Sequence, residues 1–413
     1  MVEALTDLPP NVLTEILVRL PLKTLFVSRC VCKTFLSMTS PNPHFIGVHS
    51  ANATQILMLQ FGDDFKHSDL LRFIDPELDI APEFVKKFIL KPLFHIPQIR
   101  KRNVIYYRGA VTDEENLCVL VNSCNGLLYL VRRHALDERS LVCNPVTNEY
   151  VVIPGVDTRF ETMSMWLGFS PGCNKYKVLR IVSPINGDSA TVGAQVLVVG
   201  SNSWRDIGHT FLGCEHSWDS CSTFLNGVMY WLDNSWEDVV SFDFEREMFG
   251  DIALPSEFGE EQVRNKHFMS IGLLKGCLCL SYNVHNDHHV DIWVMTKHGN
   301  QESWRKEFIV DTARPTGRAP LGQFKPLQVL RNGQILMLWI GNDLVCYDPR
   351  KKSLRFVGFH WLNVNHRMAA FTPSFVPLKD ALKVDNVRKH YKRPSGKEAN
   401  PLFQHFAQYC RNS

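Results

Sequence analysis

The sequence predicts an α+β multidomain protein in which a small three-helix N-terminal module precedes an all-β domain, a β-propeller of about six blades. Two observations carry this prediction. Leu13, Ile16, Leu17 and Leu20 recur at helical spacing, which places them on one face of a helix. Farther along, strand-like runs and turns repeat with a period of about 50 residues. We therefore expect three regions: residues 1–50 as the helical module, 51–376 as the β domain, and 377–413 as a basic tail.

Short helices are expected throughout the first module. Asp7 is a candidate N-cap of the first helix, because its carboxylate can accept hydrogen bonds from the first turn, and Pro21 ends that helix. A second helix is expected around residues 22–26 and a third at 28–37, with prolines 41 and 43 closing the module. Helices this short cannot bury all their apolar surface among themselves, so a partner or the rest of the chain should cover the remainder.

Residues 8–49 of this module resemble an F-box. The matching pieces are Leu8-Pro9, Glu15-Ile16-Leu17, Arg19-Leu20-Pro21, Lys23, Leu25, Arg29, Val31-Cys32-Lys33, Pro43, Phe45 and His49. Phe35 stands where the family often has tryptophan, which keeps an aromatic side chain at that position. The resemblance implies that the module packs on a helical adaptor of Skp type, which bridges to a cullin and a RING subunit.

The resemblance also implies which side chains meet the adaptor, with apolar anchors at helical spacing docking into a groove. The implied face consists of Leu8, Pro9, Val12, Leu13, Ile16, Leu17, Leu20, Pro21 and Leu25, with Cys32 and Phe35 belonging either to it or to the core of the module. The alternative is that these leucines only form the core of an N-terminal helical cap.

The β domain is predicted from repeated units that share one pattern. In each unit an Asn-Gly or Lys-Gly turn, at Gly126, Gly227, Gly276 or Gly333, precedes an apolar strand, and further strands follow. One more unit is expected within residues 167–208, and two strands near residues 55–75 could belong to another. Stacked around an axis, such units cover each other's faces, which favours a propeller; a pair of β-sandwiches is the alternative.

Residues 95–360 resemble the F-box-associated domain of plant F-box proteins. The pieces that carry the resemblance are Ser123-Cys124-Asn125-Gly126-Leu127, Asn144-Pro145-Val146-Thr147, Leu167-Gly168-Phe169, Tyr176-Lys177-Val178, Ser203-Trp204-Arg205, Asn226-Gly227, Tyr230-Trp231, Gly276 and Leu278. In that family the domain recognises the target protein, and different members recognise unrelated targets. The resemblance therefore implies a substrate receptor of a ubiquitin ligase and leaves its target open.

Composition narrows the class of protein further. Hydrophobic residues make up 45% and charged residues 21%, as in soluble globular proteins. A net charge of +3 is too balanced to indicate nucleic-acid binding, and the apolar runs are too short for a membrane span. The chain has twelve cysteines, and those within hydrophobic runs are Cys118, Cys143, Cys277, Cys279 and Cys346. This predicts reduced thiols and a cytoplasmic and/or nuclear protein. The basic tail is expected to be solvated and partly helical; the alternative is a nuclear-import signal at residues 388–397.

No spacing in the sequence indicates catalysis, so we expect a non-catalytic subunit without a cofactor or a metal. His285, His288 and His289 favour an ordinary loop over a metal site, because no four ligands converge. Trp218, Trp236 and Trp361 are candidate target-binding anchors; the alternative is that they fill gaps between blades. Two other functions stay open: an F-box scaffold acting outside a cullin ligase, and a glycan-binding lectin that would use Trp218 with Glu215 and Asp219.

Overall fold

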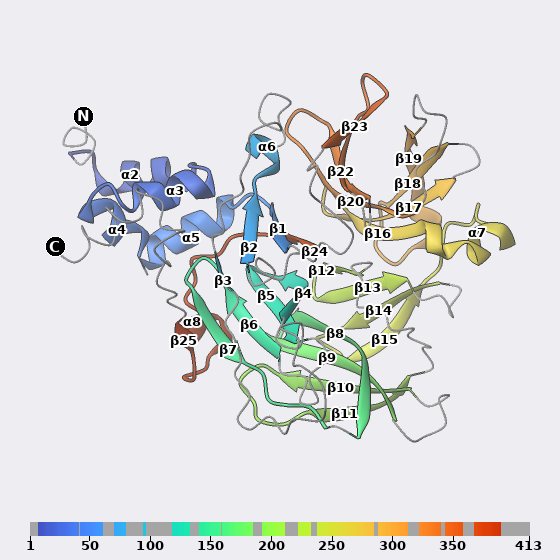
Figure 1. Ribbon diagram of the computed structural model, residues 1–413, viewed down its shortest axis with the longest axis horizontal. Helices are drawn as coiled ribbons and strands as arrows, with labels where there is room; N and C mark the ends of the chain where they lie inside the picture. Colours follow the sequence, from blue (N-terminus) through green and yellow to red (C-terminus); the bar gives the residue numbers. More distant parts are fainter. Residues whose placement is uncertain are drawn as a thin grey trace, which may run out of the picture.

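The computed structural model describes residues 7–40, 42–60, 70–79, 94–95, 118–132, 140–157, 159–184, 192–210, 222–232, 238–284, 288–312, 322–339, 343–357 and 367–389. Within this part of the chain, a helical module lies beside six antiparallel sheets that are arranged around a common centre (Figure 1). The β domain is therefore a six-bladed propeller, as the sequence predicts, and not a pair of sandwiches.

In residues 7–40 and 42–60, the helical module has four short helices: α2 (Pro10–Val18), α3 (Leu22–Ser28), α4 (Lys33–Thr39) and α5 (Pro43–Asn52). Pro9 is the N-cap residue of α2 and no side chain caps that helix, so the prediction for Asp7 is wrong. Pro43 begins α5 instead of closing the module. Asn42 Oδ1 accepts hydrogen bonds from the amides of His44 and Phe45, and a proline suits the first helical position because no donor is needed there.

Five blades have four strands each, and the second has a fifth. Blade 1 consists of β24 (Arg367–Phe371), β1 (Ile56–Gln60), β2 (Leu70–Ile74) and β3 (Phe94–His95). Blade 2 consists of β4 (Cys118–Cys124), β5 (Leu127–Arg132), β6 (Ser140–Asn144), β7 (Glu149–Val152) and β25 (Arg388–Lys389). Blade 3 consists of β8 (Phe160–Ser170), β9 (Lys175–Pro184), β10 (Val192–Val198) and β11 (Arg205–Thr210).

The remaining blades follow in chain order. Blade 4 consists of β12 (Ser222–Leu225), β13 (Val228–Leu232), β14 (Val239–Asp243) and β15 (Met248–Ile252). Blade 5 consists of β16 (Met269–Leu274), β17 (Cys277–Val284), β18 (His289–Met295) and β19 (Trp304–Asp311). Blade 6 consists of β20 (Phe324–Val329), β21 (Ile335–Trp339), β22 (Asp343–Asp348) and β23 (Ser353–Val357). Short helices α6 (Pro76–Asp79), α7 (Glu260–Arg264) and α8 (Leu378–Leu382), and 3-10 turns at Lys266–Phe268 and Gln301–Ser303, lie between or after the strands.

The predicted glycine turns are present. In blade 2, Asn125 and Gly126 have φ of 46° and 80°, and in blade 4, Asn226 and Gly227 have φ of 50° and 88°. Two consecutive residues with positive φ are typical of the hairpin turns that match the twist of antiparallel strands, and the Asn-Gly pair is favoured there. These turns set the register between the first two strands of their blades.

The ring closes through a pairing between distant parts of the chain. Strand β24 pairs antiparallel with β1, with Phe371 opposite Ile56 and Arg367 opposite Gln60. Blade 1 thus combines strands from both ends of the β domain, and this ties the first blade to the end of the sixth.

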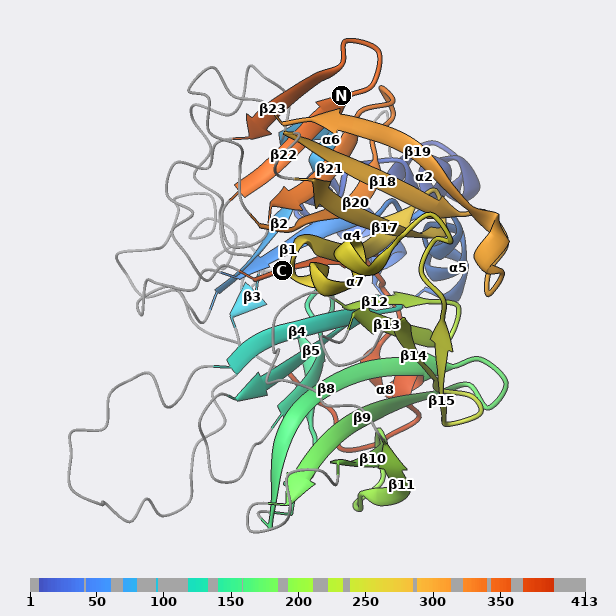
Figure 2. The same cartoon turned by 90° about the vertical axis from the view of Figure 1, so that its right-hand side faces the viewer.

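Among the described residues, the hydrophobic core is divided into six buried clusters, each lying between two neighbouring blades. Blades 2 and 3, 3 and 4, 4 and 5, 5 and 6, and 6 and 1 each share one cluster; Figure 2 shows the neighbouring blades 4 and 5 from their own side. The sixth cluster, between blades 1 and 2, also contains the core of the helical module: Leu17 and Phe45 belong to it together with Ile56 and Leu128. The module and the propeller therefore share one core.

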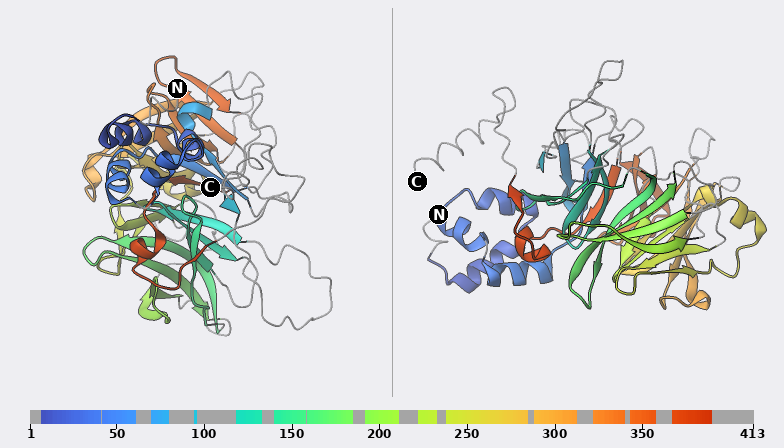
Figure 3. Two further views of the ribbon diagram at one scale, coloured as in Figure 1. Left: turned by 90° about the vertical axis from the view of Figure 1, so that its left-hand side faces the viewer. Right: turned by 90° about the horizontal axis from the view of Figure 1, so that it is seen from below.

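The start of the predicted tail is packed on the propeller. Leu378 and Leu382 of α8 are buried against blades 2 and 3, and β25 pairs with β7, with Arg388 opposite Tyr150. In Figure 3, α8 lies between the helical module and the strands. The boundary predicted at residue 376 thus falls within the packed part of the chain, and residues 390–413 lie outside the described residues.

Candidate functional site

Exposed apolar side chains are concentrated on the helical module. The large hydrophobic residues that are exposed in the described part of the chain are Val12, Ile16, Val27, Val31, Leu36, Met248 and Ile309. Five of these seven lie within the short span 12–36. Apolar side chains exposed singly are ordinary, but a concentration of them marks an interaction surface. We call the five exposed apolar residues of the module, on and between α2, α3 and α4, the module surface: Val12, Ile16, Val27, Val31 and Leu36.

The structure divides the predicted adaptor-binding residues into two groups. Val12 and Ile16 lie four residues apart on the outer side of α2, with exposed fractions of 39% and 41%. Pro9 is also exposed. Four further residues of the predicted face are half-buried: Leu8, Leu20, Pro21 and Cys32.

Three residues assigned to the adaptor face lie inside the module instead, and Phe35 takes the second of its two predicted places, the core. Leu13, Leu17, Leu25 and Phe35 are buried in the core shared with the propeller. Both sides of α2 are apolar, and the side with Leu13 and Leu17 faces inward because α2 packs on α5. A side chain covered by its own chain offers no surface to an adaptor, so these four are core residues in this structure. Val27, Val31 and Leu36, which the sequence analysis did not assign to the face, are exposed.

An aromatic group joins the module to the propeller. Phe375, which follows β24, is 5% exposed. Its ring centroid lies 5.4 Å from that of Phe45 and 4.7 Å from that of His49, both on α5, and both contacts are edge-on. It also lies 6.1 Å from the ring of Phe26 on α3, and the guanidinium carbon of Arg29 lies 5.8 Å from the Phe26 and Phe375 rings alike. We call Phe26, Arg29, Phe45, His49 and Phe375 the junction.

Polar groups of blade 2 hold the segment that carries Phe375. Asn144 of β6 is fully buried, and its amide nitrogen donates to the carbonyls of Ser374 and Val376, at 3.0 Å each. The carboxylate of Glu149 accepts a hydrogen bond of 2.7 Å from the amide of Leu378. These bonds fix the backbone on either side of Phe375, because a buried polar group that loses its partner carries a large penalty.

Burial of His49 in the junction gives the protein a predicted acid sensitivity. Desolvation lowers the pKa of His49 from 6.5 to about 4, and its Nδ1 has no hydrogen-bond partner among the described residues. Between pH 6.5 and 4, His49 is therefore protonated in the unfolded chain and neutral in the folded chain. The contribution of His49 to the free energy of unfolding is therefore full above pH 6.5. It decreases by at most about 3 kcal/mol as the pH falls from 6.5 to 4.

We expect His49→Leu to weaken the pH dependence of the free energy of unfolding between pH 4.5 and 7.5, measured by urea denaturation. The exposed His44 on the same helix supplies the control, since His44→Leu should keep the wild-type dependence. Identical slopes for all three proteins would contradict the assignment.

The predicted target-binding residues cannot be placed. Trp218, Trp236 and Trp361, and the lectin grouping with Glu215 and Asp219, lie outside the described residues, so their roles stay predictions.

Of the described side chains that could carry other chemistry, His289 is near a carboxylate, Cys279 is packed in the core, and His288 is exposed. His285 is outside the described residues; Asp291 lies 3.4 Å from His289 Nε2 and 2.7 Å from Lys306 Nζ. Cys279 is buried, which raises the pKa of its thiol. Across the residues that the structure describes, no group of three or more histidine, cysteine or acidic side chains could hold a metal ion. No helix in the same residues is long and apolar enough to cross a membrane.

Comparison with known proteins matches both parts of the chain. The family described as "F-box associated beta propeller domain" matches residues 88–380, and the F-box domain matches residues 5–45. The chain is 26% identical over 402 residues to "F-box protein At3g07870" of Arabidopsis thaliana, covering 87% of this chain and 89% of that protein. It is 29% identical over 267 residues to "F-box protein At1g47340" of the same plant, covering 59% and 52%.

Proposed function

Because this chain belongs to the plant F-box proteins with an F-box-associated β-propeller domain, we propose that it is the substrate receptor of a Skp–cullin–F-box ubiquitin ligase. An F-box implies binding to a Skp-type adaptor, and F-box proteins are generally non-catalytic. The proposal adds the cullin and RING subunits, and a target protein held by the propeller, in the cytoplasm and/or nucleus.

The observation that carries the proposal is the module surface. Burying a whole valine, leucine or isoleucine side chain contributes about 1.5–3 kcal/mol. Val12 and Ile16 are 39% and 41% exposed, so an adaptor groove that covers both gains only a fraction of this from each, and the other residues of the module surface must add to it. The mechanism is proximity: the receptor raises the effective concentration of target lysines near a charged conjugating enzyme on another subunit. This chain then needs no catalytic residue of its own.

The direct test changes the exposed residues and leaves the core untouched. We expect the double variant Val12→Asp, Ile16→Asp to weaken binding of a purified Skp-type adaptor by at least about 100-fold in calorimetry, because two desolvated apolar contacts become carboxylates. Ile309→Asp is the matched control, since Ile309 is 57% exposed on blade 5 and should leave adaptor affinity unchanged. Full affinity in the double variant would contradict the assignment of the adaptor surface.

The two alternative functions, a scaffold outside a cullin ligase and a lectin, differ from the proposal in which molecules bind this chain besides the adaptor. A scaffold outside a cullin ligase would bind the adaptor and recruit no cullin, so cullin and RING subunits would be missing from purified complexes and no ubiquitin would be transferred. A lectin would retain glycans on an array through the propeller. The proposal requires cullin recruitment that the Val12→Asp, Ile16→Asp variant loses.

A further inference from the structure

Two separate connections join the helical module to the propeller. On the N-terminal side, only residues 53–55 separate the end of α5 from the start of β1. On the C-terminal side, Phe375 lies in the segment that follows β24 of blade 1, is held by Asn144 of blade 2, and packs in the core of the module. Domains in one chain move relative to each other by default, unless their interface is extensive and apolar. Here the second connection adds an apolar contact with α5 and α3 to the short linker.

Phe375 is held from both sides. Within the module it packs on Phe45 and His49, with ring centroids 5.4 and 4.7 Å away. Towards the propeller, the side chain of Asn144 binds the carbonyls directly before and after it. The turn of blade 2 lies just as close: a Cβ atom added at Gly126 would lie 2.4 Å from Ser374 Cβ. Movement of the module would therefore have to break the junction or displace the blade 2 turn.

We propose that Phe375 is a positioning residue that locks the F-box and the propeller into one rigid body, so that a target on the propeller is presented in a fixed direction to the ubiquitin-transferring subunits. The effect on ubiquitin transfer rests on the proposed function. The rigid connection between the two domains rests on the contacts of the junction alone. A rigid receptor restricts which lysines come within reach, because effective concentration depends on the geometry that the connection permits.

The first experiment measures the geometry on the full-length chain without any partner. Spin labels introduced as non-canonical amino acids at Thr34 of the module and Glu302 of blade 5, both exposed, report the distance distribution by pulsed electron resonance. We expect a single narrow distance for the wild type and a broadened distribution for Phe375→Ala. Phe375→Leu, which keeps most of the apolar bulk, should restore the narrow distance.

Phe242→Ala separates positioning from general destabilisation. Phe242 is fully buried in blade 4 and contacts Phe244 and Phe249, at 5.0 and 4.9 Å between ring centroids. Its truncation should lower the melting temperature yet leave the distance narrow. Should Phe375→Ala fail to fold, Asn144→Ala tests the same lock by releasing the segment around Phe375, and it should also broaden the distribution.

The second experiment measures the consequence in a reconstituted ligase with adaptor, cullin and RING subunits. Mass spectrometry maps the lysines of this chain that receive ubiquitin. Phe375→Ala should redistribute the modified positions while adaptor affinity stays at the wild-type value, and Phe242→Ala should leave the pattern unchanged. A narrow distance in Phe375→Ala, or equal broadening in Phe242→Ala, would overturn the proposal. Absence of adaptor binding by the wild type would instead contradict the proposed function, because the distance measurement needs no adaptor.

Discussion

Replacing Leu17 by aspartate is expected to unfold the helical module, lowering the free energy of unfolding by about 4 kcal/mol or more. Leu17 is 2% exposed and lies in the core that the module shares with blades 1 and 2. The change removes a well-packed side chain, at about 2–5 kcal/mol, and adds the desolvation of a carboxylate that has no partner there. Thermal unfolding followed by circular dichroism measures the loss.

Ile16 provides the neighbouring control. It is 41% exposed on the same helix, so Ile16→Asp should change stability by no more than about 0.5 kcal/mol, as surface substitutions usually do. Ile16→Asp should still weaken adaptor binding. If Leu17→Asp melted at the wild-type temperature, the inward orientation of this face of α2 would be wrong.

The shared core changes how the module can be removed. Deleting residues 1–50 would uncover Phe375, whose ring packs on Phe26, Phe45 and His49 in the shared cluster. Proteins with large exposed apolar patches tend to aggregate. Partners of the propeller are therefore better identified with the Val12→Asp, Ile16→Asp variant, which leaves this core covered.

Sequence reasoning identified the module and failed to orient it. The spacing of Leu13, Ile16, Leu17 and Leu20 predicts the helix, and α2 is present. Which side is buried depends on where α5 and the propeller lie, because valine and isoleucine on one side are as apolar as leucine on the other. Helix α5 was missed although Asn42-Pro43 is a recognisable start signal, an N-cap followed by a proline at the first position.

The hairpins within the blades were predictable, because their sequence signals are local. Asn125-Gly126 and Asn226-Gly227 mark hairpins whose register depends on the turn itself. The pairing of β24 with β1 has no local signal, because residues 56 and 371 meet only once all six blades are stacked. Leu378 and Leu382 did carry a signal, an apolar pair four residues apart, which the high lysine and arginine content around them obscured.

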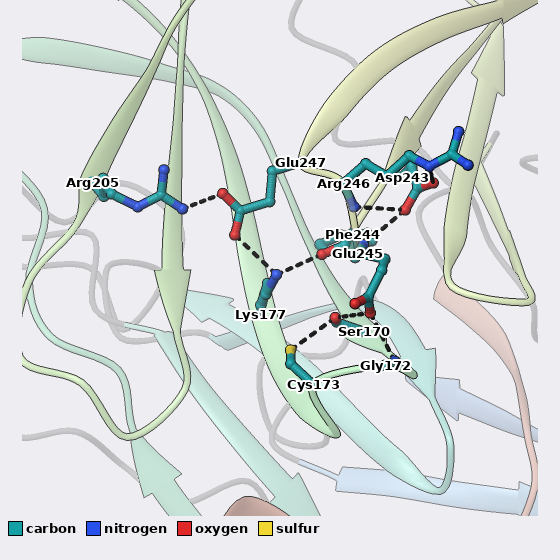
Figure 4. A network of polar contacts seen from close by, with 10 residues as sticks. All are labelled: Ser170, Gly172, Cys173, Lys177, Arg205, Asp243, Phe244, Glu245, Arg246 and Glu247. Atoms are coloured by element: carbon teal, nitrogen blue, oxygen red, sulfur yellow. Dashed lines mark hydrogen bonds and ion pairs between the residues drawn. The ribbon is translucent and has the colours of Figure 1, made fainter.

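The polar network between blades 3 and 4 depends on a buried lysine. Lys177 of β9 is 6% exposed, and its ammonium group donates to the carbonyl of Phe244 at 2.7 Å and pairs with Glu247 at 2.9 Å. Glu247 also binds Arg205, while Glu245 accepts from Ser170 and from the amide of Gly172 (Figure 4). Burial raises the pKa of Glu247, but its bonds to Arg205 and Lys177 outweigh this and leave the pKa lowered. The carboxylate is therefore ionised at neutral pH and balances the lysine.

Glu247→Gln is accordingly expected to lower the free energy of unfolding by about 3–5 kcal/mol, because removing one partner of a buried ion pair leaves an uncompensated charge. Urea denaturation of the full chain measures this loss. Adding Lys177→Met to Glu247→Gln should recover part of it, since the buried charge is then gone too. The matched control is Glu260→Gln, whose partner Arg264 is exposed; exposed pairs contribute little, so its stability should stay unchanged. Equal effects of Glu247→Gln and Glu260→Gln would show that Lys177 is solvated, and the two blades would then be held together by their apolar cluster alone.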